Sequence, residues 1–278
     1  MNHSLEDESP FKEELGPLIK TLESDPDWNK RFGAASKLFR LGKEKSVDPL
    51  IKALQNDSHP EIRRFAAVLL GRLGDPRATW ALIAALRQAL SEKDKTISFH
   101  TKEALIKIKG SDLPSILTST IDDNEEFFEM RIMALNLLGE IADTKSVECL
   151  IQIINNPDTE GKIRGRAIEV LIYTGHLAGL QLVLDLLEST TNKNFQKVVA
   201  RALCKTPLKN KTIVLRFGDA LLHIMESEES KKEEKDAELT KLAADSLKQL
   251  ASNINISFEQ LMDEIIVVRK KQNKNSLS

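Results

Sequence analysis

A repeat of 32 to 35 residues constrains the fold of this chain more than any other feature of its sequence. Residues 31–54 superimpose on residues 63–86, so that Arg31 is followed 32 positions later by Arg63. Further copies of the pattern begin near Ile97, Met130 and Ile163, and a sixth, from Phe195, keeps only its first half. A regular period of this length indicates a stack of similar structural units.

Each copy is expected to form two amphipathic helices. Its apolar residues recur every three or four positions, first at Ile62, Ala66 and Leu70 and again at Leu82 and Leu86. Small residues that can end a helix in the left-handed conformation separate the two helices, each followed by polar residues that can cap the next one: Gly42, Gly74, Gly110 and Ala142. One such pair cannot bury its apolar face alone. The sequence therefore predicts an all-α fold, an α-solenoid (superhelix) of stacked antiparallel helix pairs.

The second copy, residues 60–86, carries a distinctive motif. Arg63 opens its first helix, Leu-Gly-Arg-Leu-Gly-Asp occupies residues 70–75, and Arg77 precedes its second helix. Similar residues return between positions 130 and 145. The segment resembles a HEAT repeat of the short, phycobilin-lyase-like type, and the resemblance extends over residues 25–189 and more weakly to Phe217. It implies a fold and no single activity, because the family contains scaffolds, adaptors and a minority of enzymes.

Two other repeat families fit less well. Tetratricopeptide repeats have a similar period but require a Trp-x-x-Leu-Gly pattern that is absent, and ankyrin repeats require Thr-Pro-Leu-His. The HEAT resemblance also implies that the opening arginine of a copy pairs with an acidic residue in the turn between helices, such as Asp75 or Asp143. The arginines concerned are Arg31, Arg63, Arg131 and Arg164.

Composition sets the expected environment and partners. A net charge of -2 gives no overall basic field, so nucleic acid is an unlikely partner. The residues Met1–Pro10 are acidic and polar, and the longest apolar runs are too short to cross a bilayer. Cys149 and Cys204 suit neither a disulfide framework nor a metal spacing, and each is expected to be a buried small hydrophobe. A cytoplasmic protein without a membrane segment is predicted.

A protein partner is expected on the ridge formed by the second helices. Three rows of outward positions can be followed through the array: Asp48, Trp80, Ser115, Glu148 and Gln181; Lys52, Ala84, Ser119, Gln152 and Asp185; Gln55, Arg87, Asp122, Asn155 and Glu188. Acidic residues outnumber basic ones in these rows, which disfavours a nucleic-acid groove. The predicted partner-binding residues are Lys52, Trp80, Arg87, Glu148 and Gln152. Trp80 is either an exposed anchor or a cover over the small residues Ala81 and Ala84.

No catalytic or metal-binding residues are predicted, and no cofactor. The HEAT-like iron hydroxylases use His-Glu pairs, whereas none of the five histidines here is followed by glutamate. The leading hypothesis is a non-enzymatic scaffold or adaptor. One alternative is a tetrapyrrole (bilin) lyase or carrier, although the chain has a single tyrosine, Tyr173. Another is a nucleic-acid binder that uses the cations of the first helices: Arg63, Arg64, Arg131 and Arg164.

The two ends of the chain are expected to differ from its middle. The predicted division is an N-terminal capping helix in residues 1–24, a HEAT-like array of five to six copies in residues 25–217, and a C-terminal helical extension in residues 218–278. A last helix is predicted over Phe258–Lys271, followed by a disordered tail. The sequence leaves open whether that helix caps the array or mediates association.

Overall fold

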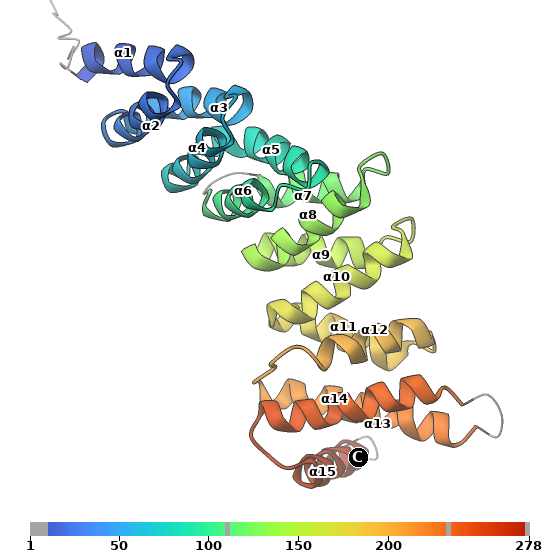
Figure 1. Ribbon diagram of the computed structural model, residues 1–278. Helices are drawn as coiled ribbons and strands as arrows, with labels where there is room; N and C mark the ends of the chain where they lie inside the picture. Colours follow the sequence, from blue (N-terminus) through green and yellow to red (C-terminus); the bar gives the residue numbers. More distant parts are fainter. Residues whose placement is uncertain (1–10, 109–111, 232–234, 276–278) are drawn as a thin grey trace, which may run out of the picture. The chain divides into compact units, whose positions relative to one another are not determined.

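The computed structural model describes residues 11–108, 112–231 and 235–275, in which every regular element is a helix (Figure 1). The chain divides into two compact units, residues 1–116 and residues 117–278. Each unit is a stack of antiparallel helices. The predicted fold class, an all-α solenoid of helix pairs, is confirmed.

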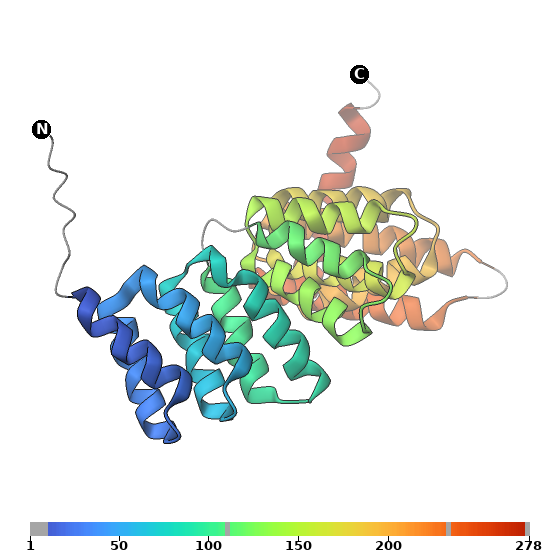
Figure 2. The same cartoon turned by 90° about the horizontal axis from the view of Figure 1, so that it is seen from above.

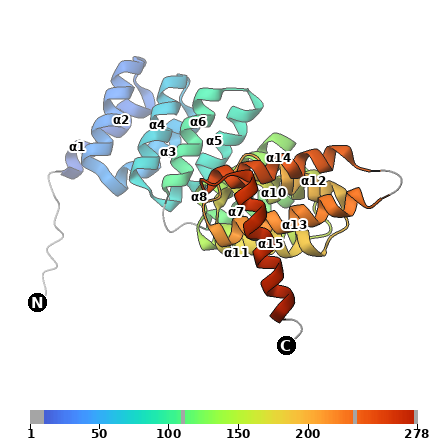
Figure 3. The same ribbon diagram turned by 90° about the horizontal axis from the view of Figure 1, so that it is seen from below.

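Unit 1 contains two layers of helices (Figures 2 and 3). The helices that open each copy pack side by side in one layer: α2 (Trp28–Gly42), α4 (Pro60–Leu73) and α6 (Lys95–Lys107). The other layer holds α1 (Phe11–Ser24), α3 (Val47–Asn56) and α5 (Thr79–Ser91). Short 3-10 helices precede α3 and α5, at Lys43–Ser46 and Pro76–Ala78, and α7 (Leu113–Asp122) spans the boundary between the units.

Unit 2 repeats the two-layer arrangement (Figure 1). Its first-helix layer consists of α8 (Phe128–Ile141), α10 (Gly161–Thr174), α12 (Lys193–Leu203) and α14 (Ala237–Asn253). Its second-helix layer consists of α9 (Thr144–Asn155), α11 (Leu177–Ser189), α13 (Lys211–Glu229) and α15 (Phe258–Asn275). The layers thus continue beyond the recognisable sequence repeat.

One leucine per first helix holds the same place in the core of its unit. These leucines are all fully buried: Leu38, Leu70, Leu105, Leu138, Leu171 and Leu203. The residue after two of them is glycine. A Cβ atom at Gly71 would lie 2.6 Å from Cα of Ala104, and one at Gly139 would collide with the side chain of Val170. The Leu-Gly dipeptide of the motif therefore allows α4 to approach α6, and α8 to approach α10, at van der Waals distance.

The turns between helices follow the expected chemistry with one difference. Gly74 and Ala142 end their helices in the left-handed conformation, with φ of 66° and 48°. At the first turn, Gly42 has φ of -90° and the left-handed φ falls on Lys43 instead, because a 3-10 turn begins there. Gly110 lies outside the described residues.

Three of the four recurring arginines, Arg31, Arg63 and Arg131, tie successive copies together, but through acceptors other than those expected. Arg31 forms a bidentate ion pair with Asp57, in which both nitrogen–oxygen distances are 2.8 Å, and it also donates to the backbone oxygen of Asp25. Arg63 donates to the backbone oxygen of Asp57 at 2.9 Å. Asp25 precedes α2 and Asp57 precedes α4, the first helices of two successive copies. The turn at Asp57 is therefore bound by both Arg31 and Arg63.

The predicted partners Asp75 and Asp143 have other roles. Asp75 caps the 3-10 turn before α5 and pairs with Arg77, and Asp143 caps α9 by accepting from the backbone N–H of Ser146. Arg131 donates instead to the backbone oxygen of Ile121 at 2.7 Å. The expectation that arginine pairs with the turn inside the copy is therefore wrong.

The ends of the array are helices that pack on one side only. α1 packs against α2 and α3, burying Leu15 and Leu22, and α15 packs against α13 and α14, burying Leu261 and Ile265. We retain as a proposal that both act as caps. The predicted boundary at residue 217 falls inside α13, and α15 continues past Lys271 to Asn275. The rest of the predicted disordered tail, residues 276–278, lies outside the described residues, as does Met1–Pro10. Cys149 is buried as expected, whereas Cys204 is half-buried.

Within the described ranges, no helix is long and apolar enough to cross a membrane. The same ranges contain no cluster of three or more histidine, cysteine, aspartate or glutamate residues that could hold a metal ion.

Replacement of Arg31 by leucine is expected to lower the free energy of unfolding by about 3 kcal/mol, because it leaves the buried carboxylate of Asp57 without its ion-pair partner. Urea unfolding followed by circular dichroism measures the change. Arg40→Leu, at an exposed position of the same helix, is the matched control and should change stability by less than about 0.5 kcal/mol. Equal losses in the two variants would contradict the role given to Arg31.

Two glycine-to-alanine variants should have opposite effects. Gly71→Ala is expected to destabilise the protein by about 1–3 kcal/mol, because its methyl group would overlap the backbone of Ala104. Gly33→Ala lies in a helix with nothing within 4 Å of the new Cβ and should stabilise by about 0.5–1 kcal/mol. Thermal unfolding of both variants checks the pair, and a stabilised Gly71→Ala would show that α4 and α6 are not in close contact.

Candidate binding groove

The predicted binding residues of unit 1 lie on α3 and α5. Trp80 is 67% exposed, so it projects from α5 and does not cover the adjacent small residues. Lys52 forms an ion pair with Glu23 of α1, with 3.0 Å between Nζ and Oε1. Arg87 is exposed two turns beyond Trp80. These three side chains share the second-helix layer of unit 1.

The other two predicted binding residues belong to unit 2. Glu148 and Gln152 are exposed on α9, one helical turn apart. The structure therefore groups the five residues as three in one unit and two in the other. Their participation in a common surface stays a prediction.

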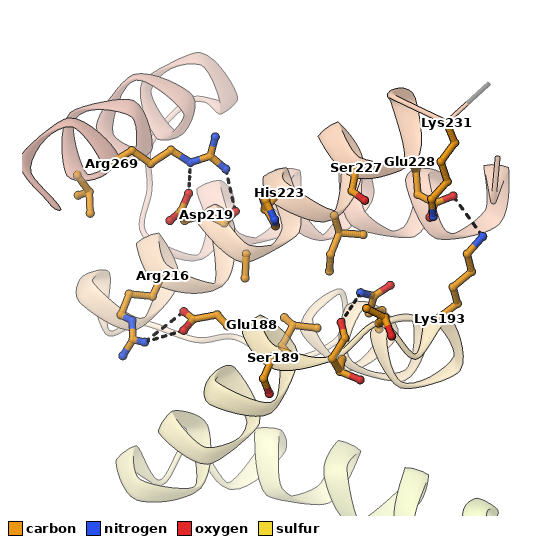
Figure 4. A pocket seen from close by; sticks show the side chains of 17 residues that line it. Glu188, Ser189, Lys193, Arg216, Asp219, His223, Ser227, Glu228, Lys231 and Arg269 are labelled. Carbon is orange, nitrogen blue, oxygen red and sulfur yellow. Dashed lines mark hydrogen bonds and ion pairs between the residues drawn. The ribbon is translucent and has the colours of Figure 1, made fainter. Parts of the chain in front are cut away.

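Unit 2 contains a groove that sequence reasoning did not find (Figure 4). Its volume is about 900 Å³, and it is lined by the end of α11, the start of α12, one face of α13 and part of α15. Leu187, Ala220 and Ile224 contribute buried apolar side chains, whereas charged and hydroxyl-bearing side chains complete the lining. The second helices α11, α13 and α15 supply most of it.

Arg216 of α13 forms the side of the groove toward α11. Its guanidinium donates to Oε1 of Gln181 at 2.6 Å and to Oε1 of Glu188 at 3.2 Å, and lies 3.7 Å from Asp185. The acidic end of the predicted ridge is thus bound by a cation from the next helix of the same layer. Arg216 is in none of the three rows in which acidic residues outnumber basic ones.

Arg269 of α15 forms the side toward the last helix. It pairs with Asp219, donates to Oε1 of Glu226 at 2.8 Å and donates to the backbone oxygen of Asp219 at 3.1 Å. Lys211 and Glu264 make a further bridge between α13 and α15, at 2.8 Å. These contacts attach α15 across α13, beside the groove (Figure 4).

Glu228 closes the far end of the groove. Its carboxylate is almost completely buried, pairs with Lys231 and Lys193, and accepts the backbone N–H of Asp236 at 2.8 Å. The hydrogen bond from Lys231 is the main reason that the pKa of Glu228 lies below its ordinary value. Glu228 is therefore ionised at neutral pH, and it fastens the chain after α13 to the start of α12.

The chemistry of the groove suits binding of an extended chain. Each lining carboxylate, Glu188, Asp219 and Glu228, is held in an ion pair with a lining cation. His223 and Ser227 are exposed between these pairs and can exchange hydrogen bonds with a backbone. From Arg216 to Ser227 the helix rises by about 16 Å, which matches about five residues of extended chain.

A smaller cavity of about 500 Å³ lies on the first-helix layer of unit 2. It is lined by residues of α8, α10 and α12, among them Asn136, Arg166 and the 66% exposed Tyr173. Arg166 donates to Asn136 at 2.8 Å and to Glu169 at 2.8 Å. This cavity offers a ligand fewer free polar groups, because its central cation, Arg166, is engaged in joining α10 to α8.

The groove was missed by sequence analysis because the predicted array ended at residue 217, inside α13, so that the rest of this helix was assigned to an extension. Arg216 and Asp219 are half-buried on a helix whose apolar residues Ile213, Phe217 and Leu221 keep the spacing of a second helix.

Replacement of Glu228 by glutamine should lower the free energy of unfolding mainly at neutral pH. Because the folded-state pKa is lowered, the ionised group stabilises the fold above its unfolded-state pKa of about 4.3, and this contribution is lost as the pH falls through the lower, folded-state value. The expected loss at neutral pH is about 1–3 kcal/mol. Chemical unfolding from pH 7 to pH 3 should show the wild type and the variant converge in acid. Glu229→Gln, at the exposed neighbouring position, is the control, and a loss for Glu228→Gln that is independent of pH would contradict this role.

Comparison with known proteins gives a family and two similar folds. A model of HEAT repeats matches residues 15–88 and 123–204. The complex of CpcE and CpcF of phycocyanin lyase from Nostoc sp. PCC7120 is similar at 20% identity and a TM-score of 0.33, covering 90% of this chain and 94% of that chain. Human deoxyhypusine hydroxylase is similar at 17% identity and a TM-score of 0.36, covering 91% and 96%. No curated protein matches the chain.

The two solved structures share little sequence with this chain and superimpose loosely, so neither bears on what this chain binds. The repeat model covers more than half of the residues, in both units. The match includes the Leu-Gly dipeptides at 70–71 and 138–139, whose close packing the structure shows. The chain belongs to the HEAT-repeat family.

Proposed function

We propose that the protein is a non-enzymatic scaffold or adaptor that binds an extended segment of another protein on its second-helix layer, in the groove of unit 2. The observation that carries this proposal is the groove of about 900 Å³ between α11, α13 and α15. Its apolar base would receive a side chain of the segment, and its polar rim would meet the backbone.

The state of the charged groups favours binding over catalysis. A general acid or base must be able to exchange a proton with its substrate. Glu188, Asp219 and Glu228 are instead held by arginine or lysine, and Glu228 has its pKa lowered by those contacts. Carboxylates in this state position neighbouring helices and offer fixed charges to a partner.

Trp80, Lys52 and Arg87 supply a second surface under the same proposal. An aromatic side chain that is 67% exposed beside charged groups has the character of an interface anchor. Glu148 and Gln152, exposed on α9, would extend the contact in unit 2. A partner with two separated binding segments could then use both units.

Three of the four arginines considered for nucleic-acid binding, Arg63, Arg64 and Arg131, are engaged within the chain. Arg63 and Arg131 donate to backbone oxygens, and Arg64 pairs with Glu61. Contacts of this kind reduce the charge available to phosphates. They support a protein partner. A cytoplasmic location, where the free thiols of Cys149 and Cys204 would remain reduced, is part of the proposal.

A displayed library of random peptides, selected on the full-length protein, tests this proposal. We expect enriched peptides that share an apolar residue flanked by charged ones and that lose affinity by about tenfold or more on Ser227→Arg, which fills the groove with a long side chain. Ser252→Arg, at an exposed serine of α14 that does not line the groove, is the matched control and should bind as the wild type does.

Two results of the selection would contradict the proposal. Enriched peptides that bind Ser227→Arg as well as the wild type would place their site elsewhere on the protein. Failure to enrich any peptide would also contradict it. Salt-sensitive retention of nucleic acid from a cell extract would then favour a nucleic-acid binder, and retention of a coloured pigment would favour a bilin lyase or carrier.

A further inference from the structure

The outward face of the last helix carries an ordered series of acidic, apolar and basic residues. On α15, Glu259 and Asp263 are exposed toward the start, Ile266 and Val267 in the middle and Lys270 toward the end. Ile266 and Val267 are 43% and 50% exposed, which is unusual for adjacent branched apolar residues. The last four of these side chains lie within an arc of about 100° around the helix.

The opposite face of α15 packs against the rest of unit 2. Leu261 and Ile265 are buried, and Gly218 of α13 provides the space for Ile265, since a Cβ at that position would lie 2.6 Å from Cδ1 of Ile265. Arg269 and Glu264 are paired with residues of α13. The apolar pair on the outer face is therefore additional to the contacts that attach the helix.

A terminal helix that only caps a solenoid presents a polar outer face. We propose that the outer face of α15 binds the same face of a second copy of this chain, with the two helices antiparallel. A two-fold axis halfway between Ile266 and Val267 sets Ile266 against Val267 of the second copy. The same axis sets Asp263 against Lys270 of the second copy, and Lys270 against its Asp263.

Charge complementarity selects both the occupant and its direction. Acidic residues precede the apolar pair and a basic residue follows it, so the face is complementary to itself only when reversed. A parallel pair would place Asp263 against Asp263 and Lys270 against Lys270. Antiparallel helix dipoles add to the same preference. An interface of one helix per copy is small, so the dissociation constant is expected to be on the order of micromolar.

Charge exchange between the two positions tests this pairing. Sedimentation velocity of the full-length protein, from low to high micromolar concentration, should show a monomer–dimer equilibrium. Asp263→Lys alone and Lys270→Asp alone should each weaken self-association by about tenfold or more, because each places like charges opposite one another. An equal mixture of these two variants should restore a dimer, and so should the Asp263→Lys, Lys270→Asp double variant.

Controls separate this pairing from unfolding and from general charge effects. All substituted positions are exposed, so circular dichroism and thermal unfolding should match the wild type. Ile266→Ser with Val267→Ser should abolish the dimer, whereas Lys241→Asp, at an exposed position of α14, should leave it unchanged. A wild type that remains monomeric throughout, or a mixture of the two single variants that fails to associate, would overturn the proposal. The first result would indicate that a different molecule covers the face, and the second that the copies associate without this charge pairing.

Discussion

A single buried leucine in the first helix of each copy is the contact on which the structure depends. The six residues of this series are wholly removed from solvent, from Leu38 in α2 to Leu203 in α12. Each is buried only because neighbouring helices cover it, so the layers must continue from one copy to the next. Burial of a leucine side chain contributes about 1.5–3 kcal/mol. The period of the sequence follows from this requirement, since every copy must return a leucine to the same place.

Two kinds of contact join neighbouring helices within a layer: close approach at a glycine, and ion pairs between long side chains. Close approach occurs in both layers, since Gly218 of α13 lies against Ile265 of α15. In the first-helix layer, Gly71 lies against Ala104 and Gly139 against Val170, which leaves little room between helices. In the second-helix layer of unit 2, Arg216 and Arg269 reach across to carboxylates on neighbouring helices. Long ion-paired side chains hold helices together while keeping space between them. The groove lies where such ion pairs line the second-helix layer of unit 2, and the proposed binding function rests on it.

Much of the fold could be predicted from local sequence, because repeat copies contact mainly their neighbours. The spacing of apolar residues identified the helices, and Gly74 marked a helix end by its left-handed backbone. Side-chain partners were harder to predict. Arg31 binds Asp57, 26 positions away, whereas Asp75 caps the turn before α5 and pairs with Arg77. Sequence periodicity does not show which of several nearby carboxylates an arginine binds.

The groove was missed for a related reason. The copy that contributes Arg216 lacks the Leu-Gly-Asp motif, yet α13 still packs in the second-helix layer. Packing requires only an apolar face of the right spacing, whereas recognition of a copy from sequence requires its turn residues as well. The exposure of Trp80, by contrast, could be predicted as one of two alternatives from its place on the helix, and the structure favours the exposed one.

Site-specific photo-cross-linking tests most directly whether the groove binds a protein segment. A benzoylphenylalanine placed at His223, inside the groove, should cross-link in native extract to one peptide sequence of a partner protein. The same probe at Lys248, exposed on α14 and outside the groove lining, should not capture that peptide. Capture of the same peptide from both positions, or of no peptide from His223, would contradict binding in the groove.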